Sequence, residues 1–367
     1  MNQKMEISEQ MTQKLIEWYA AKRRILPWRE NPTPYHVWIS EIMLQQTRVD
    51  TVKGYYARFL ASCPDIRALA EAPEDVYMKL WEGLGYYSRV RNMHKAAEEI
   101  MTVYGGEMPG SYEQLLGITG IGPYTAAAIA SIAFGEKVPA VDGNLLRVFA
   151  RLSAYPENIK TEKARKAAAE YYLRWMPEGV GTAAEAQDFY TPGSFNQALM
   201  DLGATICLPN RAPLCADCPL QDFCTAHARG EETAYPLVPE KKARRIEDRT
   251  VFLIHDAGKI VIGKRPPKGL LASLYEFPNT ESHLSEADAL KYVAGLGIQA
   301  LRIRPLPAAK HIFSHIEWHM IGYAITVDEL APFDSDHLLL VSMKELAETY
   351  SIPSAFAAYR NLLPKEG

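Results

Sequence analysis

The sequence has little of what marks a secreted or membrane protein. Only five of its 367 residues are cysteine, and no apolar run approaches the roughly 20 residues of a membrane span. Residues 1–20 have no apolar core of the signal-peptide type and are typical of an amphipathic helix. An odd number of cysteines suits a reduced metal site better than a disulfide framework, and we expect a cytoplasmic protein without a membrane partner.

An excess of positive charge is also missing. Lys and Arg number 40 against 44 Asp and Glu, which gives a formal net charge of −4. Because phosphate-binding surfaces need cations, this balance argues mildly against a nucleic-acid partner. A local basic face is compatible with such a total, so the balance does not exclude this class of partner.

The sequence does have enough apolar residues to form the cores of two domains, since 48% of its residues are hydrophobic. Residues 1–228 carry apolar side chains at helical spacing. Residues 229–248 are charged and contain Pro, which is typical of a linker. Residues 249–367 alternate β-branched runs with helical segments. We therefore predict an all-α domain, a linker and an α+β domain.

Four of the five cysteines are clustered. Their spacing is Cys207-x7-Cys215-x2-Cys218-x5-Cys224, which lets four thiolates converge on one centre. Both a 4Fe-4S cluster and a zinc ion accept four cysteines, so the spacing alone leaves the two alternatives open. Cys63 stands alone, and we interpret it as a small buried residue.

A glycine-rich turn interrupts the helical pattern at LLGITGIGPYTAAAIASIAF, residues 115–134. Gly120 and Gly122 permit a tight turn whose N–H groups, near a helix N-terminus, suit a phosphate. About twenty residues later Asp142 precedes an apolar helix, where it is either an N-cap or a catalytic carboxylate. Turn and Asp together resemble the helix-hairpin-helix glycosylases of the endonuclease III type.

That resemblance implies a 4Fe-4S cluster at the four cysteines, with zinc as the less favoured alternative. The first gap between cysteines in those glycosylases is usually six residues, and here it is seven. A carboxylate such as Asp142 stabilises the positive charge that develops on a sugar when its bond to a base breaks. The leaving base also needs a proton, so a second acid is expected.

Glu41 is the best candidate for that acid. It lies among Trp38, Ile39, Ile42 and other apolar residues, and an apolar setting raises the pKa of a carboxyl group. An exposed helical Glu is the alternative. The stretch WISEIMLQQT resembles the catalytic helix of the MutY-type adenine glycosylase family, and this resemblance implies that Glu41 protonates adenine and that Asn144 helps to polarise the site.

Tyr124 occupies a decisive position, eighteen residues before Asp142. Endonuclease III-like enzymes carry there a Lys that attacks the sugar through a Schiff base, after which the strand is cut. A phenol forms no imine, so the sequence predicts base removal without an efficient lyase step. A Tyr that merely faces the helical core is the alternative.

The same resemblance assigns DNA contacts. The segment WEGLGYYSRVRN, residues 81–92, resembles the one that wedges into the base stack, where Arg89 and Arg91 would lie near phosphates. A simple core turn is the alternative, since Gly83 and Gly85 also suit a tight connection. Ile25 stands where the family often has Asp, and residues 178–193 look like an insertion without a readable role. The resemblance implies contacts with the flipped base, the opposite base or the stack for Arg24, Trp28, Gln46, Thr47, Leu84, Tyr86 and Gln197.

The C-terminal part resembles a Nudix fold but lacks the clustered Glu residues that bind magnesium in Nudix hydrolases, which leaves recognition as its expected role. HIFSHIEWH, residues 311–319, resembles the loop with which the MutY-type family reads 8-oxoguanine. By this resemblance Phe313 stacks or packs, while Ser314 and His315 contact the lesion. A plain strand–turn–strand hairpin is the alternative.

We therefore predict a monomeric, monofunctional glycosylase that removes adenine mispaired with 8-oxoguanine in double-stranded DNA. Two rivals remain open. One is an endonuclease III-like pyrimidine glycosylase/lyase, which Tyr124 and the additional domain disfavour. The other is a non-catalytic DNA-binding protein that senses redox state through its cluster and has no need of Glu41.

Overall fold

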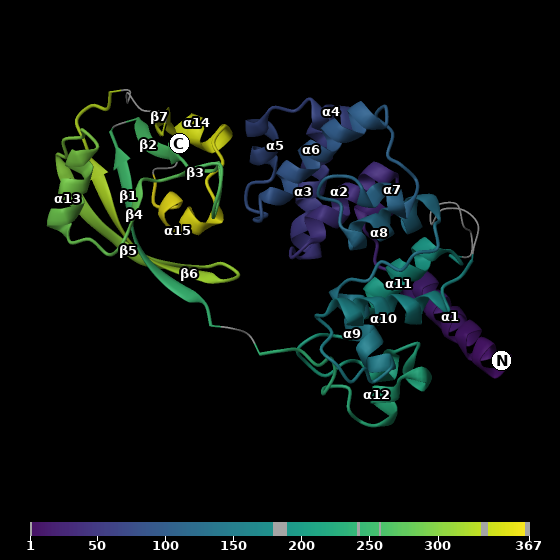
Figure 1. The fold of residues 1–367 in the computed structure, drawn as a ribbon. Coiled ribbons are helices and arrows are strands. Elements are labelled where there is room, and N and C mark those ends of the chain that lie inside the picture. Colours follow the sequence, from purple (N-terminus) through teal and green to yellow (C-terminus); the bar gives the residue numbers. More distant parts are fainter. Residues whose placement is uncertain (1, 179–188, 241–242, 257, 332–336, 364–367) are drawn as a thin grey trace. The chain divides into compact units, whose positions relative to one another are not determined.

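The structure is a computed structural model that describes residues 2–178, 189–240, 243–256, 258–331 and 337–363. The chain forms two compact units, shown in Figure 1. The helical unit consists of Met1–Glu71 and Asn92–Glu240, and the mixed unit of Ala72–Arg91 and Lys241–Gly367. Most of the segment predicted as an insertion, residues 179–188, lies outside the described residues.

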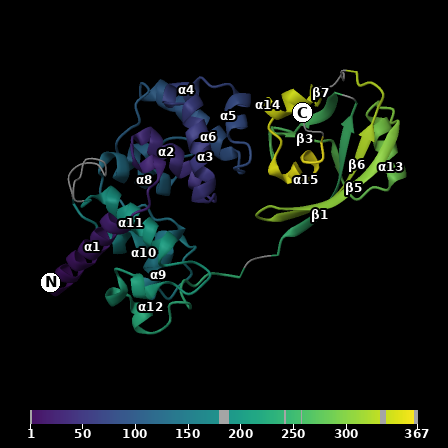
Figure 2. The same ribbon diagram turned by 180° about the vertical axis from the view of Figure 1, so that it is seen from behind.

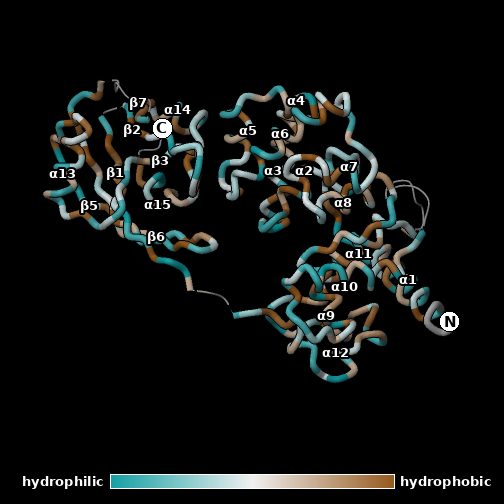
Figure 3. The backbone as a smooth tube through the Cα atoms, in the orientation of Figure 1, coloured by the Kyte–Doolittle hydropathy of each residue, from teal (hydrophilic) through white to brown (hydrophobic). Residues whose placement is uncertain are grey.

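Short and medium-length helices build the helical unit, and the hydropathy of the chain changes within single helices, as Figure 3 shows. No helix in the described part of the chain has the length and apolar character that a bilayer crossing requires. The elements are α1 (Asn2–Lys22), η1 (Pro27–Arg29), α2 (Pro34–Leu44), α3 (Val49–Ser62), α4 (Ile66–Ala70), α6 (Ser88–Val103, which begins in the mixed unit), α7 (Tyr112–Leu116), α8 (Pro123–Phe134), α9 (Gly143–Leu152), α10 (Glu162–Leu173), α11 (Pro192–Thr205), η2 (Cys215–Asp217), η3 (Gln221–Phe223) and α12 (Thr225–Ala228).

Helix boundaries follow local chemistry. Thr33 caps α2 by accepting a hydrogen bond from the His36 N–H, and Pro34 occupies the first helical position. Helix α8 begins at Pro123 and ends at Phe134, and Gly135, with a left-handed φ of 73°, caps its last turn. Nine of the twelve residues of α8 are buried, so this helix is central to the unit.

The apolar periodicity of residues 34–61 continues without interruption, but the structure divides this segment into two helices. Helix α2 ends at Leu44 and α3 begins at Val49, with Gln46 between them at a left-handed φ of 61°. A non-glycine residue held in this conformation is uncommon and is often found where a turn serves a site. The break leaves Gln46 exposed at the end of α2.

The mixed unit is built around one seven-stranded sheet in the order β3-β2-β1-β6-β5, with β4 paired to β1 and β7 paired to β2. Strands β1 and β6 run parallel and the other pairs run antiparallel. The elements are α5 (Glu74–Leu80), β1 (Arg245–His255), β2 (Lys259–Lys264), β3 (Tyr275–Glu276), β4 (Asn279–Glu281), α13 (Glu286–Gly295), β5 (Arg302–Ile312), β6 (Ile316–Thr326), β7 (Leu338–Ser342), α14 (Met343–Glu348), η4 (Ser354–Phe356) and α15 (Ala357–Arg360).

Alternation along β1 gives the sheet two buried faces. Val251 and Leu253 pack into the core on the side of α14 and α15, whereas Phe252 and Ile254 pack into the core on the side of α13. Figures 1 and 2 show α13 on one face of the sheet and α14 and α15 on the other. The result is a three-layer α+β unit, as the sequence predicted.

The C-terminal helical segment is more broken than its apolar spacing indicates. Helix α14 ends at Glu348, and Pro353 precedes η4 and the short α15. Tyr359 of α15 lies so close to β6 that a Cβ built on Gly322 would lie 2.5 Å from its ring. Only glycine at position 322 allows this approach.

Candidate active site

A cavity of about 790 Å³ lies within the helical unit, a size typical of ligand sites. Its walls come from η1, α2, α8, α9 and α11, together with the loops that join them. All four residues predicted to be catalytic line it, namely Glu41, Tyr124, Asp142 and Asn144. A cavity that joins residues 41 and 142 is the arrangement that the enzymatic interpretation requires.

Glu41 lies on α2 and is only 5% exposed. Its Oε2 accepts a hydrogen bond from the Tyr124 hydroxyl. Burial raises the pKa of Glu41 to about 7; the Tyr124 hydrogen bond opposes this rise and the charge of Asp142 adds to it. The structure therefore confirms an apolar setting for this side chain and excludes an exposed helical Glu.

Asp142 is the N-cap of α9, where its Oδ1 accepts a hydrogen bond of 2.8 Å from the Leu145 N–H. Its Oδ2 accepts another of 2.8 Å from the Asn144 side chain. Enclosure of the carboxylate raises the pKa of Asp142, and these two donors oppose the rise because they favour the anion. Asp142 therefore caps α9 and also lines the cavity.

A chain of hydrogen bonds runs behind Asp142. Asn144, which donates to Asp142, accepts a bond of 2.8 Å from the Arg147 guanidinium. Arg147 in turn donates to the carbonyl oxygens of Gly203 (2.7 Å) and Cys207 (2.8 Å). The carboxylate is therefore held in place from the segment that carries the first cysteine of the cluster.

Gly203 is where α11 approaches Asn144 most closely. A Cβ at this position would lie 2.7 Å from the Cβ of Asn144, a distance that real side chains do not reach. The glycine therefore permits the packing of α11 against α9 that fixes Asn144.

Arg24, Trp28, Gln46, Thr47 and Gln197 also line the cavity. Gln197 is 6% exposed and accepts a hydrogen bond of 3.3 Å from the Tyr19 hydroxyl. Trp28 is 5% exposed, whereas Gln46 is exposed at the end of α2. The structure thus brings these predicted base contacts together with the two carboxylates.

Sequence reasoning missed an ion network in this wall. Asp201 lies one helical turn after Gln197, is 1% exposed on its side chain, and accepts bonds of 2.8 and 2.9 Å from Arg29 and of 2.7 Å from Arg24. Burial alone would raise the pKa of Asp201, but the bonds from Arg29 and the charges of Arg29 and Arg24 hold it below its ordinary value. The i, i+4 spacing of Gln197 and Asp201 was the available signal.

Ile25 stands where the family often has Asp, and an Asp there would be expected to form a local salt bridge. Ile25 is 85% exposed and forms no part of the ion network, whose acidic member comes from α11 instead. The Arg24 salt bridge therefore exists without an acid at position 25.

Gly120 and Gly122, in the glycine-rich turn, are not among the residues that line the cavity. Gly120 has φ of 76°, and a Cβ there would lie 2.6 Å from the Cβ of Asn92, so the turn requires glycine at this position. Gly120 and Gly122 are both exposed, and α8 begins directly after Gly122. An exposed turn at a helix N-terminus has the geometry of an anion site.

The four clustered cysteines line a single pocket. The residues between Cys207 and Cys215 form a closed loop, because the Leu214 N–H donates to the Ile206 carbonyl at 2.9 Å. This hydrogen bond closes the loop at its base, and Cys207 and Cys215 both line the pocket. Four sulfur donors around one apolar pocket fit a four-cysteine metal centre by the chemistry of the donor set.

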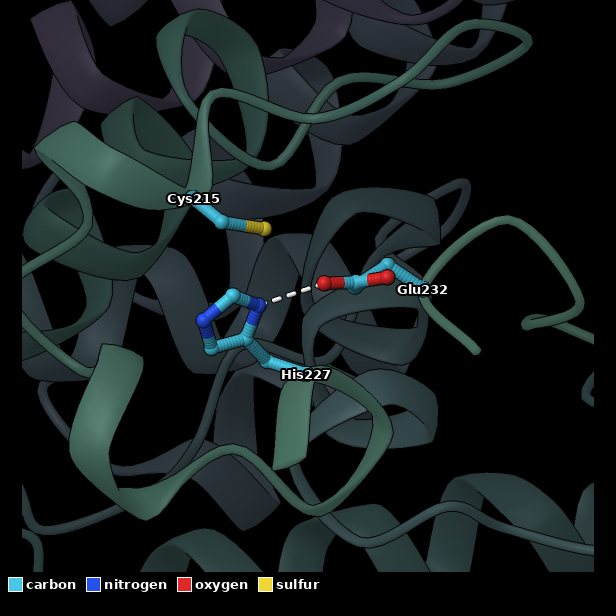
Figure 4. Close-up of side chains that lie close together, drawn as sticks. All are labelled: Cys215, His227 and Glu232. Carbon is cyan, nitrogen blue, oxygen red and sulfur yellow. Dashed lines mark hydrogen bonds and ion pairs between the residues drawn. The ribbon is translucent and has the colours of Figure 1, made fainter. Parts of the chain in front are cut away.

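A second group of possible ligands lies beside this pocket (Figure 4). Ligand atoms of Cys215, His227 and Glu232 lie within 4.8 Å of one another. However, one ring nitrogen of His227 bonds to Glu232 and the other lies 2.8 Å from the Gln221 side chain. Because both nitrogens are engaged and Cys215 belongs to the cysteine group, we assign no separate metal to these residues.

The predicted reading residues lie in the mixed unit, around a pocket of about 620 Å³. Leu84 is buried, whereas Tyr86 is 49% exposed. Ser314 and His315 are exposed between β5 and β6. Phe313 packs edge-on against Trp318, with ring centroids 4.9 Å apart.

Arg89 and Arg91 make protein contacts in this unit. The Arg89 guanidinium donates bonds of 3.1 Å to the carbonyl oxygens of Leu84 and Gly85. Burial lowers the pKa of Arg89 to about 10. Arg91 donates a bond of 2.5 Å to the Ala272 carbonyl. Both guanidinium groups thus hold the loop of residues 83–87 and its surroundings.

Comparison with known proteins agrees with these observations. Residues 39–173 match the HhH-GPD superfamily of base excision DNA repair proteins, and residues 250–361 match the NUDIX domain. A thermostable thymine-DNA glycosylase of known structure is 27% identical, with a TM-score of 0.53, and covers 62% of this chain and 98% of its own. Fold and cavity define a base excision DNA repair glycosylase with a C-terminal Nudix-like domain.

The sequence relatives narrow this class. The adenine DNA glycosylase of Mus musculus is 34% identical over 373 residues, which cover 86% of this chain and 70% of the mouse protein. That of Buchnera aphidicola subsp. Baizongia pistaciae (strain Bp) is 32% identical over 329 residues, 89% of this chain and 88% of the relative. The chain therefore belongs to the adenine DNA glycosylase family, whose members are hydrolases of N-glycosyl bonds.

Proposed function

We propose that the protein removes adenine from double-stranded DNA where adenine is paired with 8-oxoguanine, and that it acts as a monomer. The observation that carries the proposal is the pairing of Glu41 and Asp142 in the wall of one cavity of about 790 Å³. The two carboxyl groups have different surroundings, and such pairs divide the roles of acid and anion between them.

Glu41 acts as the acid. Because burial raises its pKa to about 7, a large fraction of it carries a proton at neutral pH. It transfers this proton to the adenine ring while the bond between base and sugar breaks. Neutral adenine leaves, and the bonding electrons leave with the base.

Asp142 stabilises the sugar cation that remains. The donors Leu145 and Asn144 favour its anionic form, and a carboxylate in an enclosed site attracts the developing charge strongly. Water then adds to the sugar and gives a proton to the Glu41 carboxylate, which regenerates the acid and leaves an abasic site. Asn144 holds the anion, and Tyr124 holds Glu41 through its hydroxyl.

Tyr124 is also the reason why we expect no strand cleavage. No lysine amine stands at this position to form an imine with the sugar. The expected product is therefore intact backbone with a missing base, rather than a cut strand.

The cavity supplies selectivity for the flipped base. A flipped base is read by hydrogen bonds to its edge and by packing against its faces. The Gln197 amide both donates and accepts, which suits the exposed edge of adenine. Trp28 and Arg24 form the pocket wall, Gln46 probes the space beside the base, and Arg29 adds a fixed positive charge from the same wall.

The residues that meet the opposite strand come from both units. Thr47 faces the opposite base, Leu84 and Tyr86 fill the stack, and Ser314 and His315 read the altered edge of 8-oxoguanine. Phe313 supports these residues by packing against Trp318. Gly120 and Gly122 bind a backbone phosphate through their N–H groups.

Four thiolates, from Cys207, Cys215, Cys218 and Cys224, hold a 4Fe-4S cluster in this proposal. The cluster supplies a rigid cross-link among these residues, and zinc is the alternative occupant. The chain's own contribution is the hydrogen-bonded path from Cys207 through Arg147 and Asn144 to Asp142.

A duplex assay tests the proposed function. The protein is incubated with duplexes that carry adenine opposite 8-oxoguanine, guanine or thymine, and each sample is analysed with and without later alkali. We expect strand breaks only after alkali, with the fastest rate opposite 8-oxoguanine. Breaks without alkali would favour a lyase, and a DNA-binding protein without activity would give no breaks in either sample.

A further inference from the structure

Helix α1 packs against α11 within the helical unit, and the two helices lie side by side in Figures 1 and 2. Tyr19 on α1 is 1% exposed and is not among the residues that line the cavity of about 790 Å³. Its hydroxyl reaches Gln197 of α11, which does line the cavity, and donates to the Oε1 atom at 3.3 Å. Tyr19 therefore contacts, from behind the cavity wall, the side chain that the proposed function places on adenine.

The Tyr19 hydroxyl acts as the donor in this contact. The Arg23 guanidinium is close enough to hydrogen-bond with the same hydroxyl, and because a guanidinium can only donate, it occupies the acceptor side of that oxygen. Burial raises the pKa of Tyr19, although the charge of Arg29 and the bond from Arg23 oppose the rise, so the hydroxyl keeps the proton that it donates. The atom of Gln197 that faces Tyr19 is therefore its carbonyl oxygen.

The ring of Tyr19 is itself held on two sides. Phe189 lies edge-on to it, with ring centroids 5.9 Å apart, and the Arg29 guanidinium lies 5.7 Å from its centroid. Arg29 is fixed in turn by Asp201, to which it donates bonds of 2.8 and 2.9 Å. The Tyr19 hydroxyl therefore occupies a defined point against which the Gln197 amide is oriented.

The other end of the Gln197 amide is available to a ligand. Within the described part of the chain, its Nε2 has no hydrogen-bond partner, and this atom is not one of the polar atoms that are sealed in the core without a partner. The Oε1 atom has a second lone pair beyond the one that Tyr19 occupies. The amide therefore offers the cavity one donor and one acceptor, in an order that the bond from Tyr19 fixes.

A fixed order of donor and acceptor distinguishes adenine from hypoxanthine, a purine of nearly the same shape. A flipped base is read along its Watson–Crick edge. Adenine presents there a 6-amino donor beside the N1 acceptor, whereas hypoxanthine presents a 6-oxygen acceptor beside an N1–H donor. An amide that pairs Oε1 with the amino group and Nε2 with N1 suits adenine at both positions and opposes hypoxanthine at both. Half a turn of the amide would reverse this preference.

We propose that Tyr19 is a positioning residue that locks the Gln197 amide in the orientation complementary to adenine, and that this lock disfavours 6-oxopurines such as hypoxanthine. The inference rests on the proposed function, in which Gln197 contacts the flipped base. Tyr19 touches no substrate in it and acts only through Gln197.

A comparison of the two purines tests this inference. Single-turnover release is measured from duplexes that carry adenine or hypoxanthine opposite 8-oxoguanine, with the unaltered protein and with Tyr19→Phe. The variant keeps the ring and removes only the hydroxyl, so the amide becomes free to rotate. We expect the ratio of the adenine rate to the hypoxanthine rate to fall by about threefold to tenfold, the range for one lost hydrogen bond. A merely structural role of Tyr19 would change both rates alike and would not move the ratio.

Two further variants establish whether the effect passes through Gln197. Gln197→Met keeps the length of the side chain and removes both polar atoms, so in this background Tyr19→Phe should leave the ratio unaltered. Tyr35→Phe is the matched control, because the Tyr35 hydroxyl is also buried, donates to the Cys63 carbonyl at 2.7 Å, and does not line the cavity. This control should not change the ratio. Thermal melting of each variant establishes that it is folded.

Three results would overturn the inference. One is a ratio that Tyr19→Phe does not alter, which includes hypoxanthine release that stays undetectable in both proteins. The second is an equal fall of the ratio with and without the Gln197 amide, and the third is an equal fall in Tyr35→Phe. Failure of the proposed function looks different, because the unaltered protein would then release no adenine.

Discussion

Replacement of Glu41 by Gln should stabilise the protein at alkaline pH, although it greatly lowers the rate of adenine release. The residue is 5% exposed, and burial raises its pKa to about 7 from an ordinary value of 4.5. The folded protein therefore holds the Glu41 proton more tightly than the unfolded chain does. Gln keeps the size and the hydrogen bond with Tyr124 without any proton to lose.

The sign and size of the effect follow from linkage. As the pH rises from about 4.5 to about 7, the unfolded chain loses the Glu41 proton first, so the free energy of unfolding falls over this window. One pKa unit corresponds to about 1.4 kcal/mol, so the ionised carboxylate lowers the free energy of unfolding by about 3 kcal/mol above about pH 8. The Glu41→Gln variant should gain that amount relative to the unaltered protein.

Urea denaturation at about pH 5 and about pH 8 measures this gain, with Glu9→Gln on the exposed side of α1 as the control. The difference in free energy of unfolding between Glu41→Gln and the unaltered protein should be larger at the higher pH. The control should show no such change. A Glu41→Gln variant whose advantage is the same at both pH values would refute the claim that Glu41 is held as an acid by burial.

Three further substitutions have defined outcomes. Tyr124→Phe removes the hydrogen bond that lowers the pKa of Glu41, so the pH above which adenine release declines should move upward in a rate–pH profile. Gly203→Ala places a Cβ 2.7 Å from the Cβ of Asn144, and we expect a loss of about 1–3 kcal/mol in chemical denaturation together with slower adenine release. Asp142→Asn keeps the cap of α9 but loses the anion, so single-turnover rates should fall by at least about 100-fold while duplex affinity in a filter-binding assay is retained. Unchanged rates in Asp142→Asn would remove this residue from its proposed role.

Local patterns predicted much of the fold and of the cavity. The spacing of Gly120 and Gly122, the Asp142 cap and the apolar neighbours of Glu41 each depend on residues close in sequence. Local rules for turns, caps and buried helices therefore apply to them directly. The β-branched runs of residues 249–367 likewise predicted strands, and β1 and β2 form an antiparallel pair there.

What the sequence could not reveal depends on distant contacts. The Asp201 carboxylate meets Arg29 across 172 positions, and Glu82 meets Arg360 across 278. The spacing within α11 places Asp201 on the face of Gln197, but it does not identify a partner as distant as Arg29. For the same reason Ala72–Arg91 read as one more helical segment, although its contacts place it in the mixed unit. The break at Gln46 was hidden for another reason, since apolar spacing continues on both sides of it.

The pH dependence of adenine release under single-turnover conditions tests the central claim most directly. If Glu41 delivers the proton, the rate falls as the pH rises above about 7, and the Glu41→Gln variant, measured in the same buffers, has a much lower rate without that decline. A decline of the same shape in both proteins, or a Glu41→Gln variant that releases adenine at the unaltered rate, would contradict it.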